Sequence, residues 1–85
     1  MTNAAQLEVL LLQELGIILD KSVEPQDKLV DLGLDSFAIM QIIAYLEDTF
    51  GIEIPEERLP VENFYNVRVI AEWVQPMTDS AEASQ

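Results

Sequence analysis

The chain has 85 residues, 49% of them hydrophobic, and its 16 acidic side chains outnumber 4 lysines and arginines, for a formal net charge of −12. This length allows one domain with a single small core, and the apolar content argues against intrinsic disorder. The charge argues against binding to nucleic acid or anionic lipid, because both depend on clusters of Lys and Arg. It suits association with basic patches on partner proteins, although acidity also serves solubility alone.

The composition also limits the chemistry, because the chain has no histidine and no cysteine. It provides no Ser-His pair, no disulfide and no zinc–thiolate site, so any thiol chemistry has to come from an added group. The N-terminus lacks the basic region and the cleavage site of a signal peptide. No apolar run approaches the about 20 residues of a membrane-spanning helix. We therefore expect a soluble protein of the cytoplasm.

The first predicted helix begins at a cap on Asn3 or Thr2 and ends near Ile18. Its apolar residues follow the i, i+3, i+4 spacing of a stripe that faces the core. They are Leu7, Leu10, Leu11, Leu15 and Ile18. Val9 and Leu12 lie toward the edges of this stripe, where a partner surface is an alternative to a purely structural role.

Helical periodicity lapses from Leu19 to Leu34, which predicts a long loop. A loop of roughly 16 residues is usually functional or held by its own apolar contacts. Four apolar residues are the expected contacts: Val23, Leu29, Val30 and Leu32. The carboxylates of Asp27, Asp31 and Asp35 have neither the spacing nor the terminal glutamate of an EF-hand loop. We interpret them as solvated and expect no metal site.

The end of this loop is a tight turn that leads directly into a second helix. Gly33 supplies the backbone freedom that a sharp turn needs. Asp35 is a favoured N-cap residue, which places Ser36 at the first helical position. Unsatisfied N–H groups and the positive end of the helix dipole make this position favourable for a phosphate. A nucleophilic Ser36 is excluded for want of a base, so a modification site and an ordinary residue of the capping region remain open.

The second helix is predicted from Ser36 to about Phe50, with Gly51 following as its C-terminal cap. Leu46, Phe50 and either Ile42 or Ile43 should point inward. The helix carries two apolar stripes, more than one buried face requires, and the surplus is available to a partner. Ala38 and Gln41 are expected to be exposed. Met40 and Ala44 either belong to the exposed surplus or pack against the third helix.

The rest of the chain predicts short elements followed by a last helix. Ile52-Glu53-Ile54 alternates like a strand but has no second strand to pair with, so we expect an extended connector. A short third helix should begin at Pro55 and end near Leu59, where Pro60 stops it. The turn Val61–Tyr65 should bring Phe64 into the core.

The last helix should begin after Asn66 as its cap and run from Val67 to about Gln75. Its inner stripe consists of four residues: Val67, Ile70, Ala71 and Val74. Trp73 should straddle the edge of the core. Pro76 is expected to end the ordered domain, residues 1–76, and to leave a frayed polar tail over residues 77–85.

Two segments resemble a known family. Asp31-Leu32-Gly33-Leu34-Asp35-Ser36-Phe37 resembles the D-x-G-x-D-S-L signature of acyl and peptidyl carrier proteins, with Phe37 where Leu or Met is usual. Leu46-Glu47-Asp48-Thr49-Phe50-Gly51-Ile52-Glu53-Ile54-Pro55 resembles the L-E-x-x-F-x-x-x-I-P segment of the same family. At this spacing the resemblance covers nearly the whole chain. It implies an all-α, four-helix bundle with a long loop between helices 1 and 2 and a short third helix.

The resemblance also implies a function. Ser36 would carry a covalent 4′-phosphopantetheine derived from coenzyme A, attached by a separate phosphopantetheinyl transferase that recognises Asp35 and the turn at Gly33. The thiol of this arm would hold an acyl or aminoacyl group as a thioester. The chain would then be a monomeric, stand-alone carrier and not an enzyme. It would be served by a loading ligase or acyltransferase and by downstream synthase enzymes.

In this family the outer face of the second helix is the docking surface for partner enzymes and is often acidic. Six residues match that surface here: Phe37, Met40, Gln41, Ala44, Glu47 and Asp48. Since acid appears only at the last two, the resemblance implies docking through apolar contacts. It favours a dedicated polyketide, nonribosomal peptide or modified-lipid pathway. The alternatives are a general carrier of fatty-acid synthesis and an unmodified scaffold module.

Overall fold

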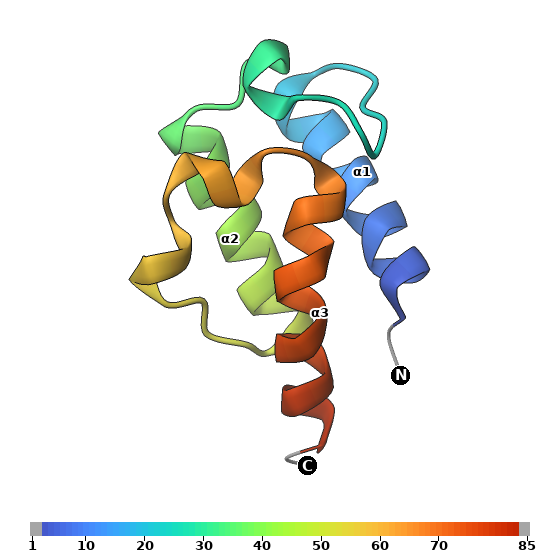
Figure 1. Ribbon diagram of the computed structural model, residues 1–85, viewed down its shortest axis with the longest axis vertical. Helices are drawn as coiled ribbons and strands as arrows, with labels where there is room; N and C mark the ends of the chain where they lie inside the picture. The colour runs from blue at the N-terminus through green and yellow to red at the C-terminus, as the bar shows by residue number, and fades with distance from the viewer. Residues whose placement is uncertain (1–2, 84–85) are drawn as a thin grey trace.

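The computed structural model describes residues 3–83, and within this range it contains helices and no strand. The α-helices are α1 (Ala4–Leu19), α2 (Ser36–Phe50) and α3 (Val67–Ala83). Three short 3₁₀ helices connect them: η1 (Leu29–Leu32), η2 (Glu56–Arg58) and η3 (Val61–Phe64). Figure 1 shows α1 running opposite to α2 and α3. The expected all-α fold is confirmed.

The core lies where α1 packs against both other α-helices and where η3 contacts α2 and α3. From α1 it takes Leu7, Leu11 and Leu15, all fully buried at i, i+4 spacing, whereas Leu10 and Ile18 are only partly buried. Phe64 of η3 is fully buried, as expected, and its ring meets Trp73 edge-on at a centroid distance of 5.5 Å. η3 therefore fills the space between α2 and α3.

The short third helix expected from Pro55 to about Leu59 is only the 3₁₀ turn η2, and the turn expected over Val61–Tyr65 is η3. Pro55 and Pro60 bracket η2 and leave four residues between them, too few to offset the cost of nucleating an α-helix. The N–H groups of Arg58 and Leu59 donate to the carbonyls three residues earlier, at 3.0 Å each. The fourth member of the bundle is thus made of 3₁₀ turns.

The last helix does not end near Gln75 as expected, because α3 continues through Pro76 to Ala83. Pro76 has no N–H to donate to the carbonyl of Glu72, so the helix loses one hydrogen bond at this point. Thr78, one turn beyond Gln75, is buried, and its hydroxyl donates to the carbonyl of Gln75 at 2.9 Å. This buried contact favours continuation of the helix. The last part of the expected tail, residues 84–85, lies outside the described residues.

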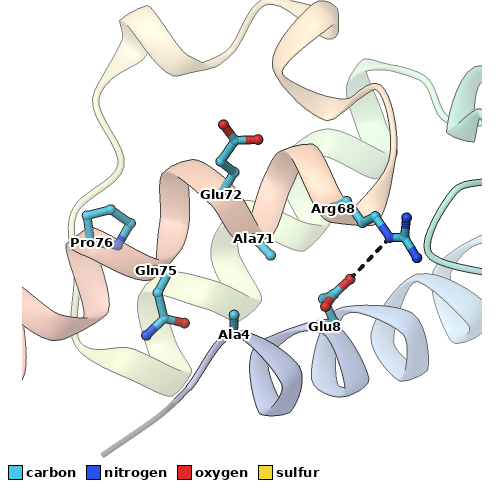
Figure 2. A pocket seen from close by; sticks show the side chains of 7 residues that line it. All are labelled: Ala4, Glu8, Arg68, Ala71, Glu72, Gln75 and Pro76. Atoms are coloured by element: carbon cyan, nitrogen blue, oxygen red, sulfur yellow. Dashed lines mark ion pairs between the residues drawn. The ribbon is translucent and has the colours of Figure 1, made fainter.

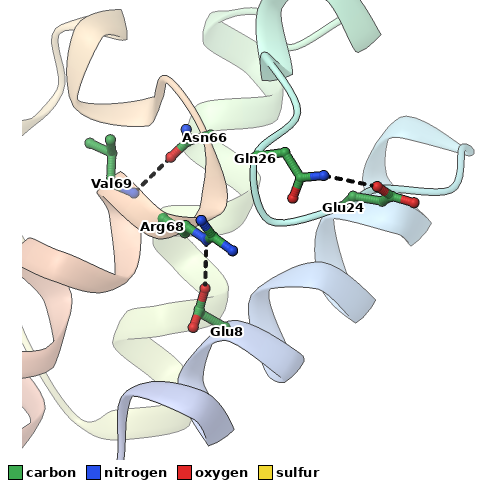
Figure 3. A network of polar contacts seen from close by, with 6 residues as sticks. All are labelled: Glu8, Glu24, Gln26, Asn66, Arg68 and Val69. Carbon is green, nitrogen blue, oxygen red and sulfur yellow. Dashed lines mark hydrogen bonds and ion pairs between the residues drawn. The ribbon is translucent and has the colours of Figure 1, made fainter.

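The cap of α3 is as expected. Asn66 Oδ1 accepts a hydrogen bond from the N–H of Val69 at 2.8 Å (Figure 3). In the same region Arg68 forms an ion pair with Glu8 of α1, with 3.8 Å between Nε and Oε1. Because the Arg68 side chain is 67% exposed, this pair contributes little to stability. No helix among the described residues has the length and apolarity to cross a bilayer.

The long connection between α1 and α2 is held by Leu29, which is fully buried and whose N–H donates to the carbonyl of Tyr65 at 3.0 Å. Val23 and Leu32 are partly buried against the core. Val30 is 55% exposed, so its expected contact with the core is wrong. In a 3₁₀ turn residues three apart share a side, which groups Leu32 with Leu29 and turns Val30 away.

Candidate functional site

The turn before Ser36 is held on both sides by buried residues. The N–H of Gly33 donates to the carbonyl of Val30 at 3.1 Å, and the N–H of buried Leu34 donates to that of Leu29 at 3.0 Å. Gly33 has a φ of 102°. A Cβ built at this position would meet nothing within 4 Å, so the backbone angle and not crowding requires glycine. These hydrogen bonds and the buried leucines therefore hold the turn in one conformation at the start of α2.

The first turn of α2 is capped by Asp35, as predicted. Its Oδ1 accepts from the N–H of Ala38 and its carbonyl accepts from the N–H of Ile39, both at 2.9 Å. Ser36 is the first helical residue and is exposed. The N–H groups of Ser36 and Phe37 precede the first intrahelical hydrogen bond, so they remain available to an anion. The arrangement presents a hydroxyl to solvent at the positive end of the helix.

The outward side of α2 begins directly after Ser36. Phe37 is 71% exposed and Met40 is 59% exposed. Gln41 and Ala44 are exposed as well, so the alternative that Met40 and Ala44 pack against the third helix is wrong. We call the exposed residues at helical spacing along this side the α2 face. They are Phe37, Met40, Gln41, Ala44 and Asp48.

The inward side of α2 contains Ile42, Ile43 and Leu46, all buried, whereas Phe50 is only partly buried. The expectation that Ala38 is exposed is wrong, since it is only 3% exposed. Ala38 lies four residues before Ile42 and therefore shares its buried side. Its small side chain leaves the start of α2 close to the rest of the core.

Glu47 has a structural role that the sequence did not indicate. Its Oε2 accepts a hydrogen bond from the N–H of Ile54 at 2.9 Å, which ties the connector after α2 to the helix. Ile52 of this connector is buried and Ile54 partly buried, as expected of an extended segment that closes the core. Of the two acidic residues matched to a docking surface, only Asp48 is exposed and outside such a contact.

The loop carboxylates do not assemble into a cation site. Asp27 Oδ2 accepts from the N–H of Glu24 at 2.9 Å, the local turn bond typical of aspartate. Across the described residues, no three carboxylate, histidine or cysteine side chains come together in a way that could hold a metal ion.

Two hollows are relevant to the location of the site. One, of about 430 Å³, lies along the seam of α1 and α3, where Figure 2 shows Glu8 and Arg68 on opposite walls. It includes no residue of the turn or of α2. The other, of about 480 Å³, is lined by Asp35 and Phe37, the two neighbours of Ser36. The second hollow therefore belongs to the region of the site.

A capped helix with an exposed first-turn serine, on an all-α fold, is the arrangement that the resemblance to carrier proteins implied. The family model of the phosphopantetheine attachment site matches residues 5–75. An acyl carrier protein from Zymomonas mobilis subsp. mobilis is 37% identical over 55 residues, which cover 65% of this chain and 70% of that protein. No solved structure matches the chain. The chain belongs to the phosphopantetheine-binding carrier proteins.

Members of this family carry a covalently attached 4′-phosphopantetheine and act as carriers for other enzymes. The residues present fit this group. An exposed serine at a helix N-terminus offers both an accessible oxygen and N–H groups for the negative charge of a phosphodiester. Phosphopantetheinyl transferases and synthase enzymes are the general partners of such carriers.

Proposed function

We propose that Ser36 is the attachment site of the arm and that the chain carries an acyl or aminoacyl intermediate. The observation that carries this proposal is the exposure of Ser36 at the first position of α2, directly after the Asp35 cap and the Gly33 turn. Attachment joins Ser36 Oγ to phosphorus and breaks the pyrophosphate bond of coenzyme A. The adenosine bisphosphate leaves, and the transferase takes the serine proton.

Once attached, the arm supplies a thiol that holds the cargo as a thioester. The chain itself then has two tasks, which are to position Ser36 and to be recognised by partner enzymes. The Asp35 cap and the Gly33 turn hold Ser36 at a fixed point of the surface. The dipole and the free N–H groups of α2 favour the phosphodiester by about 0.3–1 kcal/mol, and this local attraction opposes the repulsion from a chain of net charge −12.

The α2 face is the surface that we assign to partner enzymes. Its first two turns present the large apolar side chains of Phe37 and Met40, and its acidic contribution is Asp48. Exposed apolar residues of this size are typical of interaction sites. Partners with apolar or basic patches therefore suit this face, namely a transferase, a loading ligase or acyltransferase, and downstream synthases. An α2 face with so little acid favours a dedicated biosynthetic pathway over general fatty-acid synthesis, and we assign the carrier to the cytoplasm by its likeness to acyl carrier proteins.

The test is the intact mass of the protein after incubation with a broad-specificity phosphopantetheinyl transferase and coenzyme A. We expect a gain of one phosphopantetheine, located by peptide mapping on Ser36, and no gain in the Ser36→Ala variant. An established carrier in the same tube controls for transferase activity. An unmodified chain beside a modified control, or a modification that persists in Ser36→Ala, would contradict the proposal.

A further inference from the structure

The hollow beside Ser36 is a groove between three parts of the chain. It has a volume of about 480 Å³, within the about 300–1,000 Å³ of small-molecule sites. The end of α1, the turn after η1 and the start of α2 form its walls. Its lining includes Leu19, Lys21, Leu32, Asp35, Phe37 and Gln41. Because Asp35 and Phe37 flank Ser36 in the sequence, a group on Ser36 Oγ begins at the rim of this groove.

The chemistry of the lining is mixed in a way that matches the arm. Leu19, Leu32 and Phe37 offer apolar surface to methyl and methylene groups. The amide of Gln41 can both donate to and accept from the amides of phosphopantetheine. Lys21 offers a cation to the phosphate. An amide-bearing phosphodiester can bond to both polar side chains, whereas a purely alkyl chain uses neither.

Lys21 differs from the three other cations of the chain. Arg68 pairs with Glu8, while Lys28 lies 5.8 Å from the ring centroid of Tyr65 and Arg58 lies 5.8 Å from that of Trp73. In the part of the chain that the structure describes, Lys21 has no ion pair, hydrogen bond or ring contact from its side chain. In a protein of net charge −12, a cation left unpaired beside the attachment point is a counter-charge for an incoming phosphate.

We propose that the phosphopantetheine arm rests in this groove between visits to partner enzymes, with its phosphate near Lys21 and its amides at Gln41. This inference rests on the proposed attachment at Ser36. Phe37 and Gln41 line the groove and also belong to the α2 face. A partner that docks on the α2 face therefore competes with the arm for these two side chains.

The test uses the full chain, loaded with an unlabelled arm on ¹³C,¹⁵N-labelled protein, with loading at Ser36 verified by mass and peptide mapping. Isotope-filtered NOE spectra then report which protein methyl groups lie against the arm. We expect contacts to the methyls of Leu19 and Leu32. A loaded protein with no such contacts, or with contacts only to other helices, would overturn the inference and leave the proposed function intact. Failure to load Ser36 would overturn both.

Two variants with the same change in charge separate the role of Lys21 from a general effect of charge. Lys21→Glu should abolish the arm's contacts with Leu19 and Leu32. Lys28→Glu is the matched control, because Lys28 lies against Tyr65 and does not line this groove. It should keep these contacts. Equal loss in both variants, or retention in both, would contradict the assigned role of Lys21.

Discussion

The outward sides of α1 and α2 both expose large apolar residues, but they do so in different ways. On α1 the exposed residues are Val9 and Ile17, eight positions and about 12 Å apart along the helix axis. On α2 they are Phe37 and Met40, which at i, i+3 spacing are neighbours on one side of the helix. Single exposed apolar residues are common on soluble proteins, whereas contiguous ones mark interaction sites.

The comparison shows that exposure alone does not identify a binding surface. Phe37 and Met40 of α2 indicate a binding surface because they adjoin one another and lie next to Ser36. Inside the molecule the two helices are alike, since each contributes fully buried aliphatic side chains to the same core.

The largest effect is expected where the helices are equivalent. Leu11→Ala in α1 and Leu46→Ala in α2 each remove a fully buried side chain, and each should lower the free energy of unfolding by about 2–5 kcal/mol. Urea denaturation followed by circular dichroism measures both. A cost below 1 kcal/mol for either variant would show that its helix does not share the common core as described.

A smaller effect is expected at the turn that starts α2. Gly33→Ala places a side chain at a φ of 102° and should cost about 1–3 kcal/mol of stability. Since the turn carries Ser36, the rate of phosphopantetheine transfer should also fall. Gly51→Ala, at a φ of 65° after the far end of α2, is the control. It should lose stability without a comparable fall in the transfer rate of the folded protein.

The caps of α1 and α2 provide a third comparison. Asn3 accepts from the N–H of Gln6 at 2.8 Å, and Asp35 accepts from the N–H of Ala38 at 2.9 Å. Asn3→Ala and Asp35→Ala should each cost about 0.5–2 kcal/mol of stability. Only Asp35→Ala should slow modification of Ser36, measured by mass under conditions where both variants are folded. Equal rates would indicate that the cap does not position Ser36.

Local signals explain which parts of this structure could be predicted from the sequence. The caps at Asn3, Asp35 and Asn66 and the apolar spacing that follows them gave the starts of the three α-helices to within a residue. Each such signal lies within one helical turn of the feature that it predicts. The turn at Gly33 followed from a local pattern of the same kind, whereas Phe37 was expected at the outer face of the second helix because of the family resemblance.

Most of the differences depend on packing and hydrogen bonds that a local pattern does not report, whereas η2 is kept short by the prolines on either side of it. The carboxylate of Glu47 accepts from the N–H of Ile54, Ala38 packs into the core, and Val30 is exposed while Leu29, whose N–H donates to the carbonyl of Tyr65, is buried. The continuation of α3 through Pro76 likewise coincides with the burial of Thr78, which the polar sequence of the tail did not indicate. Local propensity cannot report such contacts, since tertiary packing overrides it.

The groove beside Ser36 also lay beyond prediction. Its walls come from α1, the turn after η1 and α2, so only the folded chain brings Lys21 close to the neighbours of Ser36. The sequence placed Lys21 in a loop with no assigned role. The attachment point could be predicted from the sequence, whereas the groove beside it can be identified only from the folded structure.

The most direct test of the difference between the two helices is the kcat/KM of a phosphopantetheinyl transferase for three proteins: wild type, Met40→Glu in α2 and Val9→Glu in α1. Both variants exchange an exposed apolar side chain for a carboxylate and should change stability by less than about 0.5 kcal/mol. We predict that Met40→Glu loses more than about 1 kcal/mol of transition-state binding, a fall of about fivefold or more, while Val9→Glu matches the wild type. Equal values for all three proteins, or equal losses in both variants, would contradict the assignment of partner recognition to the α2 face.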